Sequence, residues 1–158
     1  MGTVKGFIVD DERSSIQNLQ QKLEAFCPDL AIAGSSDKPE EALEKIRQLK
    51  PDVVFLDIEM PRMSGLKLAA ALPDFSGEII FTTAYNHYAI DAIRISAFDY
   101  LVKPIAIEDL QNAVARLVKR NQTATRERLD VLRQALSEAK SQEDKIALPT
   151  AEGIEFLR

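Results

Sequence analysis

Short apolar runs alternate with longer amphipathic stretches along the first part of the chain. Apolar and β-branched residues dominate five runs, which predict strands at Gly6–Val9, Leu30–Gly34, Val53–Leu56, Ile79–Thr82 and Tyr100–Val102. Between the runs, apolar residues recur at intervals of three and four, the spacing of one helix face, as at Ile16, Leu19, Leu23 and Phe26 and at Leu43, Ile46 and Leu49. The chain therefore alternates between predicted strands and predicted helices.

The predicted strands are apolar nearly throughout. Strands of that kind, separated by helices, are typical of a parallel sheet that helices cover on both faces. Five of them predict an α/β fold, a flavodoxin-like doubly wound five-stranded parallel sheet. Folds of this class bind ligands beyond the carboxyl ends of the strands, where the winding reverses.

Two polar positions indicate where helices begin. Asp37 precedes Pro39, which predicts an N-cap carboxylate followed by proline in the first turn. Ser64, followed by Gly65, predicts a second helix start.

The pattern changes beyond the fifth predicted strand. Residues from Glu108 to about Ala139 contain neither glycine nor proline, which predicts one extended C-terminal helix. Its first apolar stripe, within Leu110–Val118, can pack on the sheet. A second stripe, with Leu129, Leu132 and Leu136, has no sheet to cover. We expect it to pair with a second copy as a short coiled coil or to pack on a further domain.

The final segment has the form of a β-hairpin. Within Lys145–Arg158, Ile146 and Leu148 alternate along the chain, Glu152 and Gly153 provide a turn, and Ile154, Phe156 and Leu157 follow. A lone hairpin is barely stable in water, so we expect the opening of a second domain that has been cut off, by engineering rather than in nature. The expected division is a first domain at 1–120, a helical linker with a possible coiled coil at 121–143, and a domain fragment at 144–158.

Composition narrows the class of protein. With 158 residues, 46% of them hydrophobic, the chain can bury a core and is not expected to be disordered. The net charge of −5 argues against coating nucleic acid through bulk charge. The single cysteine, Cys27, suits a reducing compartment, and the N-terminus has no apolar stretch long enough for a signal peptide or membrane span. We expect a cytoplasmic protein with no membrane partner.

Acidic residues stand at the ends of two predicted strands. Asp10 and Asp11 directly follow the first, and Asp57 directly follows the third. In a parallel sheet wound as proposed, these carboxylates converge at one edge, where they cannot all stay ionised without a counter-charge. A hard divalent cation meets that need, and Mg²⁺ prefers oxygen ligands with several waters retained. The sequence therefore predicts a Mg²⁺ site.

Complementary groups are expected at the same edge. Thr82 and Thr83 end the fourth predicted strand, and Lys103 ends the fifth, immediately before Pro104. A hydroxyl, an ammonium and a cation around one carboxylate make an anion-binding pocket with a nucleophile at its centre. Carboxylates act as nucleophiles in phosphoryl transfer, and the metal and the lysine would neutralise charge on the transferring group.

Four motifs together resemble the receiver domain of response regulators. They are Ile8–Glu12, Leu56–Pro61, Thr83–Tyr85 and Tyr100–Pro104. All four occur in order and at strand ends, over roughly residues 4–120. The resemblance implies a signalling switch that receives a phosphoryl group from a sensor histidine kinase, catalyses only its own phosphorylation and dephosphorylation, and is otherwise no enzyme.

The resemblance also implies the metal site and the phosphoacceptor. Asp57 corresponds to the phosphorylated aspartate. Asp11 corresponds to a direct metal ligand and Asp10 to a second acidic residue that acts largely through water. The backbone carbonyl of Glu59 would complete the protein's share of the Mg²⁺ shell, together with Asp57 itself.

The remaining roles concern the switch. Lys103 would contact a phosphoryl oxygen, and its bond to Pro104 is usually cis in this family. Thr83 corresponds to the hydroxyl that closes on the phosphoryl group, and Tyr100 to the aromatic residue that turns inward with it. The surface near helix four and strand five would report the change, and it is one expected face of a homodimer.

A looser resemblance concerns the output. Phe81–Ile90 and Ala97–Leu101 are similar to receivers that precede a LytTR-type DNA-binding domain, and the hairpin from Lys145 is similar to the beginning of that domain. The resemblance implies that the full-length protein controls transcription, with DNA bound only through the missing domain.

Three other functions remain open. A receiver can act as a docking module that needs no phosphorylation. A phosphatase or mutase with an aspartyl-phosphate intermediate would use Glu59 as a second acid two residues beyond Asp57, but it needs a substrate-covering cap, and no insertion is long enough. A flavodoxin-like cofactor binder needs a phosphate loop rich in glycine, serine or threonine, where this chain has Asp10, Asp11 and Glu12.

Overall fold

The computed structural model of the chain describes residues 3–85 and 97–142. The elements follow one another along these residues as the sequence predicts. Their bounds are β1 Val4–Val9, α1 Arg13–Phe26, β2 Leu30–Ser36, α2 Pro39–Leu49, β3 Val53–Asp57, α3 Gly65–Ala70, β4 Glu78–Thr83, β5 Asp99–Val102 and α5 Ile107–Gln142. The segment 86–96, where the helix-four surface is expected, and the hairpin predicted at 145–158 lie outside the described residues.

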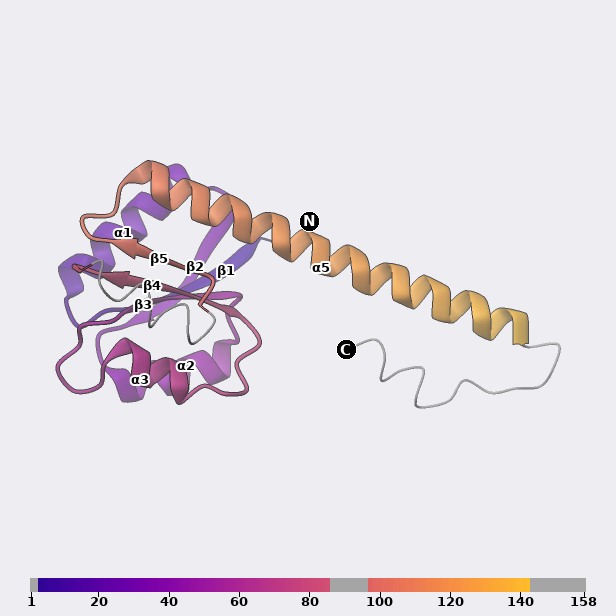
Figure 1. The fold of residues 1–158 in the computed structure, drawn as a ribbon, viewed down its shortest axis with the longest axis horizontal. Coiled ribbons are helices and arrows are strands. Elements are labelled where there is room, and N and C mark those ends of the chain that lie inside the picture. Colours follow the sequence, from indigo (N-terminus) through magenta and orange to yellow (C-terminus); the bar gives the residue numbers. More distant parts are fainter. Residues whose placement is uncertain (1–2, 86–96, 143–158) are drawn as a thin grey trace. The chain divides into compact units, whose positions relative to one another are not determined.

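The sheet is parallel throughout, with the spatial order β2-β1-β3-β4-β5. The chain runs from β1 outward to β2 and then back past β1 to β3, so the winding reverses between β1 and β3. Figure 1 shows α1 and the first turns of α5 over one face of the sheet and α2 and α3 over the other. The predicted doubly wound sheet is confirmed, and it sets the carboxyl ends of β1 and β3 side by side at the place where such folds bind ligands.

The core is built mainly on β1 and β3. Every side chain of β3 is buried. One apolar cluster joins these two strands to α2, α3 and β4; it includes Phe7, Val9, Val54, Leu56, Ala42, Ile46, Leu68 and Phe81. Full burial of such a side chain stabilises the fold by about 1.5–3 kcal/mol. Phe26 and Leu49, predicted on buried helix faces, are exposed, and each is the last residue of its helix.

The predicted cap of α2 is wrong. The N-cap residue is Lys38, and Pro39 is the first helical residue. The carboxylate of Asp37 instead accepts a hydrogen bond from Arg13 at 3.0 Å, which holds the pKa of Asp37 below its usual value. The hydroxyl oxygen of Ser36 accepts from the backbone N–H of Lys38 at 3.2 Å. The Asp37 carboxylate, predicted to cap α2, therefore forms an ion pair with Arg13 instead.

The chain divides into two compact units, residues 1–116 and 117–158. Helix α5 confirms the predicted extended C-terminal helix. In the first unit its residues Leu110 and Val114 are buried. In the second unit Leu129, Leu132 and Leu136 are 46%, 41% and 61% exposed. Among the residues that the structure describes, no helix has the length and apolar character needed to span a membrane.

Candidate functional site

Three carboxylates meet at the carboxyl edge of the sheet. Asp10 and Asp11 follow β1, and Asp57 is the last residue of β3. One carboxylate oxygen from each of the three lies within 4.8 Å of the other two. Asp10 is 4% exposed and Asp57 3% exposed, so two of these groups are buried where an unpaired charge is costly. The cluster could hold a metal ion.

Backbone groups of the following loops hold the two buried carboxylates. The N–H of Asp10 donates to the carbonyl oxygen of Ser36 at 3.2 Å, which extends the β1–β2 pairing by one residue. Asp10 Oδ1 accepts from the N–H of Glu12 at 3.0 Å. Asp57 Oδ1 accepts from the N–H of Glu59 at 3.4 Å. Each carboxylate is thus oriented by the loop that follows its own strand.

Helix α3 approaches the end of β3 very closely. A Cβ atom at Gly65 would lie 2.3 Å from the carbonyl oxygen of Asp57, so a side chain at residue 65 requires the backbone to move. The N–H of Gly65 donates to the carbonyl oxygen of Ile58 at 2.9 Å. Ser64 caps α3 by accepting from the N–H of Lys67 at 3.2 Å, which confirms the predicted helix start. Glycine at this position lets the loop after Asp57 fold back.

Lys103, the residue after β5, brings positive charge to the cluster. Its Nζ lies 2.8 Å from Asp10 Oδ2 and 3.5 Å from Asp57 Oδ1. Its N–H donates to the carbonyl oxygen of Thr83 at 2.7 Å, and its bond to Pro104 is cis, as the resemblance implied. One ammonium beside three carboxylates leaves two negative charges in excess when all are ionised. This excess matches the charge of a divalent cation.

The same excess of negative charge affects proton binding. The pKa of Asp57 is raised to about 8, chiefly because burial disfavours the ionised form; the charge of Asp10 adds to this effect and Lys103 opposes it. Burial by itself would lower the pKa of Lys103, but its hydrogen bond to Asp10 and the charge of Asp57 outweigh burial and raise it. A cation bound beside Asp57 would leave this carboxyl ionised and able to act as a nucleophile.

Thr83 and Glu59 are joined by a contact that the sequence reasoning missed. Thr83 ends β4 and is 0% exposed, and its hydroxyl lies 2.6 Å from Glu59 Oε2. Glu59 Oε1 accepts from the N–H of Ala84 at 2.8 Å. The sequence reasoning assigned Glu59 a place in the metal shell through its backbone carbonyl and, in the phosphatase alternative, a role as a second acid, but no contact with Thr83. Asp57 pairs with Thr82 in the β3–β4 ladder, and this register could have placed the two following loops side by side.

Tyr100 lies in β5, opposite Phe81 in the β4–β5 ladder. It is half-buried and packs against the apolar cluster of the core. The structure therefore puts Tyr100 beside the strand that ends in Thr83. Its inward movement on phosphorylation remains a prediction.

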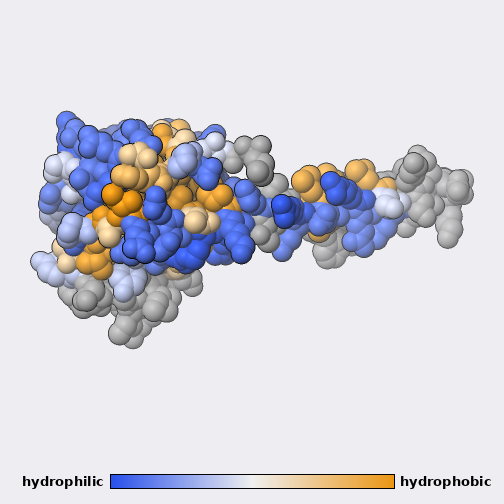
Figure 2. Space-filling model, turned by 90° about the horizontal axis from the view of Figure 1, so that it is seen from above, coloured by the Kyte–Doolittle hydropathy of each residue, from blue (hydrophilic) through white to orange (hydrophobic). Residues whose placement is uncertain are grey.

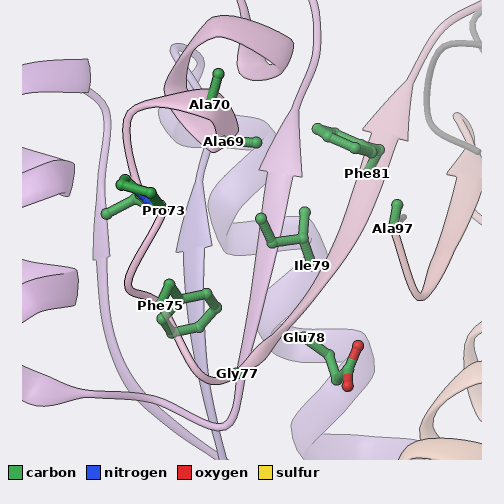
Figure 3. A pocket seen from close by; sticks show the side chains of 10 residues that line it. Ala69, Ala70, Pro73, Phe75, Gly77, Glu78, Ile79, Phe81 and Ala97 are labelled. Atoms are coloured by element: carbon green, nitrogen blue, oxygen red, sulfur yellow. The ribbon is translucent and has the colours of Figure 1, made fainter. Parts of the chain in front are cut away.

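Two of the hollows in the first unit bear on the position of the site. One, of about 270 Å³, borders the carboxylate cluster and is lined by Asp11, Asp37, Lys38, Pro39, Met60, Pro61 and Arg62. The other, of about 330 Å³, lies beside α3 and β4 (Figure 3); its lining includes Phe75, Ile79, Phe81 and Ala97. Among the described residues that line the second hollow, Glu78 is the one titratable group, whereas the first hollow includes Asp11 of the carboxylate cluster in its lining.

Residues 7–115 match the family model of the response regulator receiver domain. The chain belongs to this family. The matched span contains the whole acidic edge of the sheet, from Asp10 to Lys103. The protein is thus a receiver domain of a two-component system, and the resemblance drawn from the four motifs is confirmed at this level.

Individual proteins agree with the family assignment. The receiver is 42% identical over 119 residues to an uncharacterized response regulatory protein of Vibrio cholerae, across 75% of this chain and 50% of that protein. It is 43% identical over 115 residues to the transcriptional regulatory protein BtsR of Escherichia coli, across 72% of this chain and 48% of BtsR. The chain thus spans about half the length of the curated relatives it matches.

Solved structures share the fold. The response regulatory domain of protein mrkE from Klebsiella pneumoniae superposes with a TM-score of 0.69 at 30% identity, across 76% of this chain and 99% of that structure. The receiver domain of AraT from Geobacillus stearothermophilus gives a TM-score of 0.68 at 29% identity, across 77% and 97% of the two chains.

Proposed function

We propose that this receiver is a phosphorylation-activated switch in which Asp57 accepts a phosphoryl group from a sensor histidine kinase in a Mg²⁺-dependent reaction. The observation that carries the proposal is the surroundings of Asp57. It is buried, two further carboxylates lie within ligand distance of it, and Lys103 Nζ lies 3.5 Å from its Oδ1. A nucleophilic carboxylate with cationic groups around it is what phosphoryl transfer to an aspartate requires.

The residues divide the reaction between them. A carboxylate oxygen of Asp57 attacks the phosphorus of a phosphohistidine; the new P–O bond forms as the P–N bond breaks, and the kinase histidine leaves. Lys103 holds a phosphoryl oxygen, exchanging its contact with Asp10 for the new anion. Asp11, Asp57 and the backbone carbonyl of Glu59 would hold Mg²⁺, with Asp10 acting largely through water, and the bound ion would supply positive charge to neutralise the transferring group. Thr83 and Tyr100 then close on the product.

The contacts of Glu59 argue against the phosphatase alternative. A phosphatase needs a second acid beside its nucleophile, and Glu59 has the spacing for this role. Both of its carboxylate oxygens are engaged, however, with the Thr83 hydroxyl and the Ala84 N–H. The switch is therefore favoured over the enzyme.

The output is part of the same proposal. In the full-length protein, a LytTR-type DNA-binding domain would follow the receiver at 1–120 and the helical linker at 121–143, and phosphorylation would control transcription through it. The relatives named above are about twice as long as the matched region, and BtsR is named as a transcriptional regulatory protein. These facts support an output domain beyond the receiver.

A homodimer through α5 would connect input to output. Leu129, Leu132 and Leu136 recur at intervals of three and four and are exposed in the single chain. Figure 2 shows hydrophobic side chains along this helix of the second unit. Two heptads alone are marginal, so we propose that the helix adds to, rather than replaces, contacts near β5. A chain that ends before Asn121 should sediment with weaker self-association; an unchanged profile would dispose of the coiled coil.

Intact-protein mass spectrometry tests the central proposal. The receiver is incubated with acetyl phosphate and Mg²⁺, beside a sample with EDTA and beside the variant Asp57→Asn. We expect one phosphoryl adduct that needs the metal and is absent from the variant. Labelling that persists in Asp57→Asn would show that another residue is the acceptor.

The variant Lys103→Ala tests whether Lys103 couples phosphorylation to a change in self-association. We expect this variant to lose any phosphorylation-dependent change in self-association, because no ammonium then ties the phosphoryl group to the end of β5. Self-association that responds to phosphorylation as in the wild type would remove Lys103 from the switch.

A further inference from the structure

Glu59 connects the loop after the phosphoacceptor to the switch residue. Its backbone N–H donates to Asp57 Oδ1 at 3.4 Å. Its two carboxylate oxygens accept hydrogen bonds from two donors at the end of β4, the Thr83 hydroxyl at 2.6 Å and the Ala84 N–H at 2.8 Å. One residue thus touches both the nucleophile and the groups expected to close on its product.

The hydroxyl proton of Thr83 points to Glu59. Three polar atoms lie near Thr83 Oγ1: Glu59 Oε2 at 2.6 Å, the carbonyl oxygen of Tyr85 at 3.0 Å and the N–H of Tyr85 at 3.0 Å. The Tyr85 N–H is itself a donor, so it uses an acceptor lone pair of the hydroxyl. A hydroxyl has one proton, and the shorter contact to an ionised acceptor is the stronger one. Glu59 therefore receives the hydrogen bond.

We propose that the Glu59 carboxylate is an internal competitor of the phosphoryl group, because it occupies the Thr83 hydroxyl and the Ala84 N–H that the phosphorylated site would use. This inference rests on the proposed function. Thr83 is 0% exposed, so its hydroxyl has no access to bulk water and must donate to one protein-bound partner at a time. A phosphoryl oxygen on Asp57 and the carboxylate of Glu59 are both anions, so they also repel each other. Closure of Thr83 on the phosphoryl group requires that Glu59 be displaced.

The competition gives Glu59 a defined influence on the switch. With the carboxylate in place, the receiver favours the state in which Thr83 is held away from Asp57. Without the carboxylate, the Ala84 N–H loses this acceptor and the Thr83 hydroxyl keeps only the neutral Tyr85 carbonyl at 3.0 Å, so both donors bind an anion at Asp57 more readily. Removal of the Glu59 side chain should therefore shift the receiver toward the active arrangement and strengthen binding of a phosphoryl mimic. The backbone carbonyl assigned to the metal is untouched by a side-chain substitution.

The test is a titration with beryllofluoride at saturating Mg²⁺, with binding measured for the wild type, Glu59→Ala and Glu59→Gln. Loss of a hydrogen bond to a charged group corresponds to about a ten-fold change in affinity, so Glu59→Ala should bind the mimic roughly ten-fold more tightly. Glu59→Gln should lie between the two, because an amide has one acceptor oxygen and can satisfy only one of the two donors. Glu41→Ala, which removes a distant carboxylate paired with Lys45, should leave the affinity unchanged.

Combining the Glu59 variants with Thr83→Ala distinguishes competition for the Thr83 hydroxyl from charge repulsion by Glu59. If Glu59 acts only through its charge, Glu59→Gln tightens binding as much as Glu59→Ala, and both gains persist in a Thr83→Ala background. If it competes for the hydroxyl, the gain from Glu59→Ala shrinks in that background. Equal affinities of wild type and Glu59→Ala, or a full gain without Thr83, would overturn the proposal.

Amide NMR gives a direct readout of the contact. In Mg²⁺-free protein, the Ala84 N–H resonance should move upfield in Glu59→Ala as its charged acceptor is lost, while the rest of the spectrum shows an intact fold. An unmoved Ala84 resonance also overturns the proposal. If neither wild type nor Glu59→Ala binds beryllofluoride with Mg²⁺, the proposed function itself fails, and the competitor role fails with it. Binding by both proteins with equal affinity, in contrast, keeps the switch and removes only the competition.

Discussion

Along β1 and β3 and the residue at their carboxyl ends, two kinds of equally buried side chain have opposite effects on stability. Up to Val9 and Leu56, the buried side chains of the core are apolar, and their removal from water stabilises the fold. The next residues, Asp10 and Asp57, are buried to the same degree, but their side chains are carboxylates. Burial of a carboxylate destabilises the fold unless a positive charge lies near it. The apolar core therefore stabilises the fold enough to tolerate, at the edge of the sheet, three carboxylates whose negative charge Lys103 offsets only in part.

The largest effect should come from the apolar region. Phe55 is 0% exposed in β3, and Phe55→Ala should lower the free energy of unfolding by about 3–5 kcal/mol, because the lost apolar contacts leave a cavity. Urea unfolding in EDTA measures this. A loss below about 1 kcal/mol would mean that the core rearranges easily and that the contrast between the regions is weaker than burial suggests.

Gly65 lies where the two regions meet. Gly65→Ala should destabilise the receiver by about 1–3 kcal/mol and slow phosphorylation, because its Cβ would lie 2.3 Å from the backbone oxygen of Asp57. Gly34→Ala is the matched control. There the nearest atom, 3.1 Å away, belongs to the Phe7 side chain and not to the backbone, so the added Cβ meets a milder clash. Equal losses for the two variants, measured by urea unfolding and by phosphorylation rate, would contradict the tight approach of α3 to β3.

The acidic edge should respond with the opposite sign. Asp57→Asn removes a carboxyl group that is ionised above about pH 8 in the metal-free receiver, and at that pH we expect the variant to be more stable than the wild type by at least about 1–2 kcal/mol, since each pKa unit by which burial disfavours the charge corresponds to about 1.4 kcal/mol. Asp52→Asn is a control, because the Asp52 carboxylate accepts from the Lys5 N–H at 2.8 Å and its loss should not stabilise. A lower stability of Asp57→Asn in EDTA would show that Lys103 already compensates the cluster.

The raised pKa of Asp57 also makes the stability of the metal-free receiver depend on pH. The pKa of Asp57 is about 8 in the folded receiver against a model value of 3.8, so the folded state binds this proton more tightly than the unfolded state. The stabilisation is complete below about pH 4 and is lost as the pH rises through about 8. Chemical unfolding of the metal-free protein across this range should therefore show stability that falls with pH, with a shallower slope in Asp57→Asn. Identical slopes would exclude Asp57 as their source.

Convergence of the site residues could be predicted because it follows from the topology. Asp57 ends its strand, Asp10 and Lys103 directly follow theirs, and parallel strands end at the same edge of a sheet. The contacts among them could not be predicted in the same way. Lys103 pairs with Asp10, and Asp37 pairs with Arg13 instead of capping α2. Several donors and acceptors are within reach in these loops, and the alternatives differ by only about 1 kcal/mol.

The sequence by itself determined the order of strands and helices, the buried faces and the parallel sheet, because these depend on periodic patterns summed over many residues. From them followed the place of the carboxylates and of Lys103. Only the tertiary structure decided that Gly65 must be a glycine and that Glu59 bonds Thr83 across 24 residues of sequence. Such contacts depend on how two loops pack to within a fraction of an ångström, and no local pattern in the chain encodes that distance.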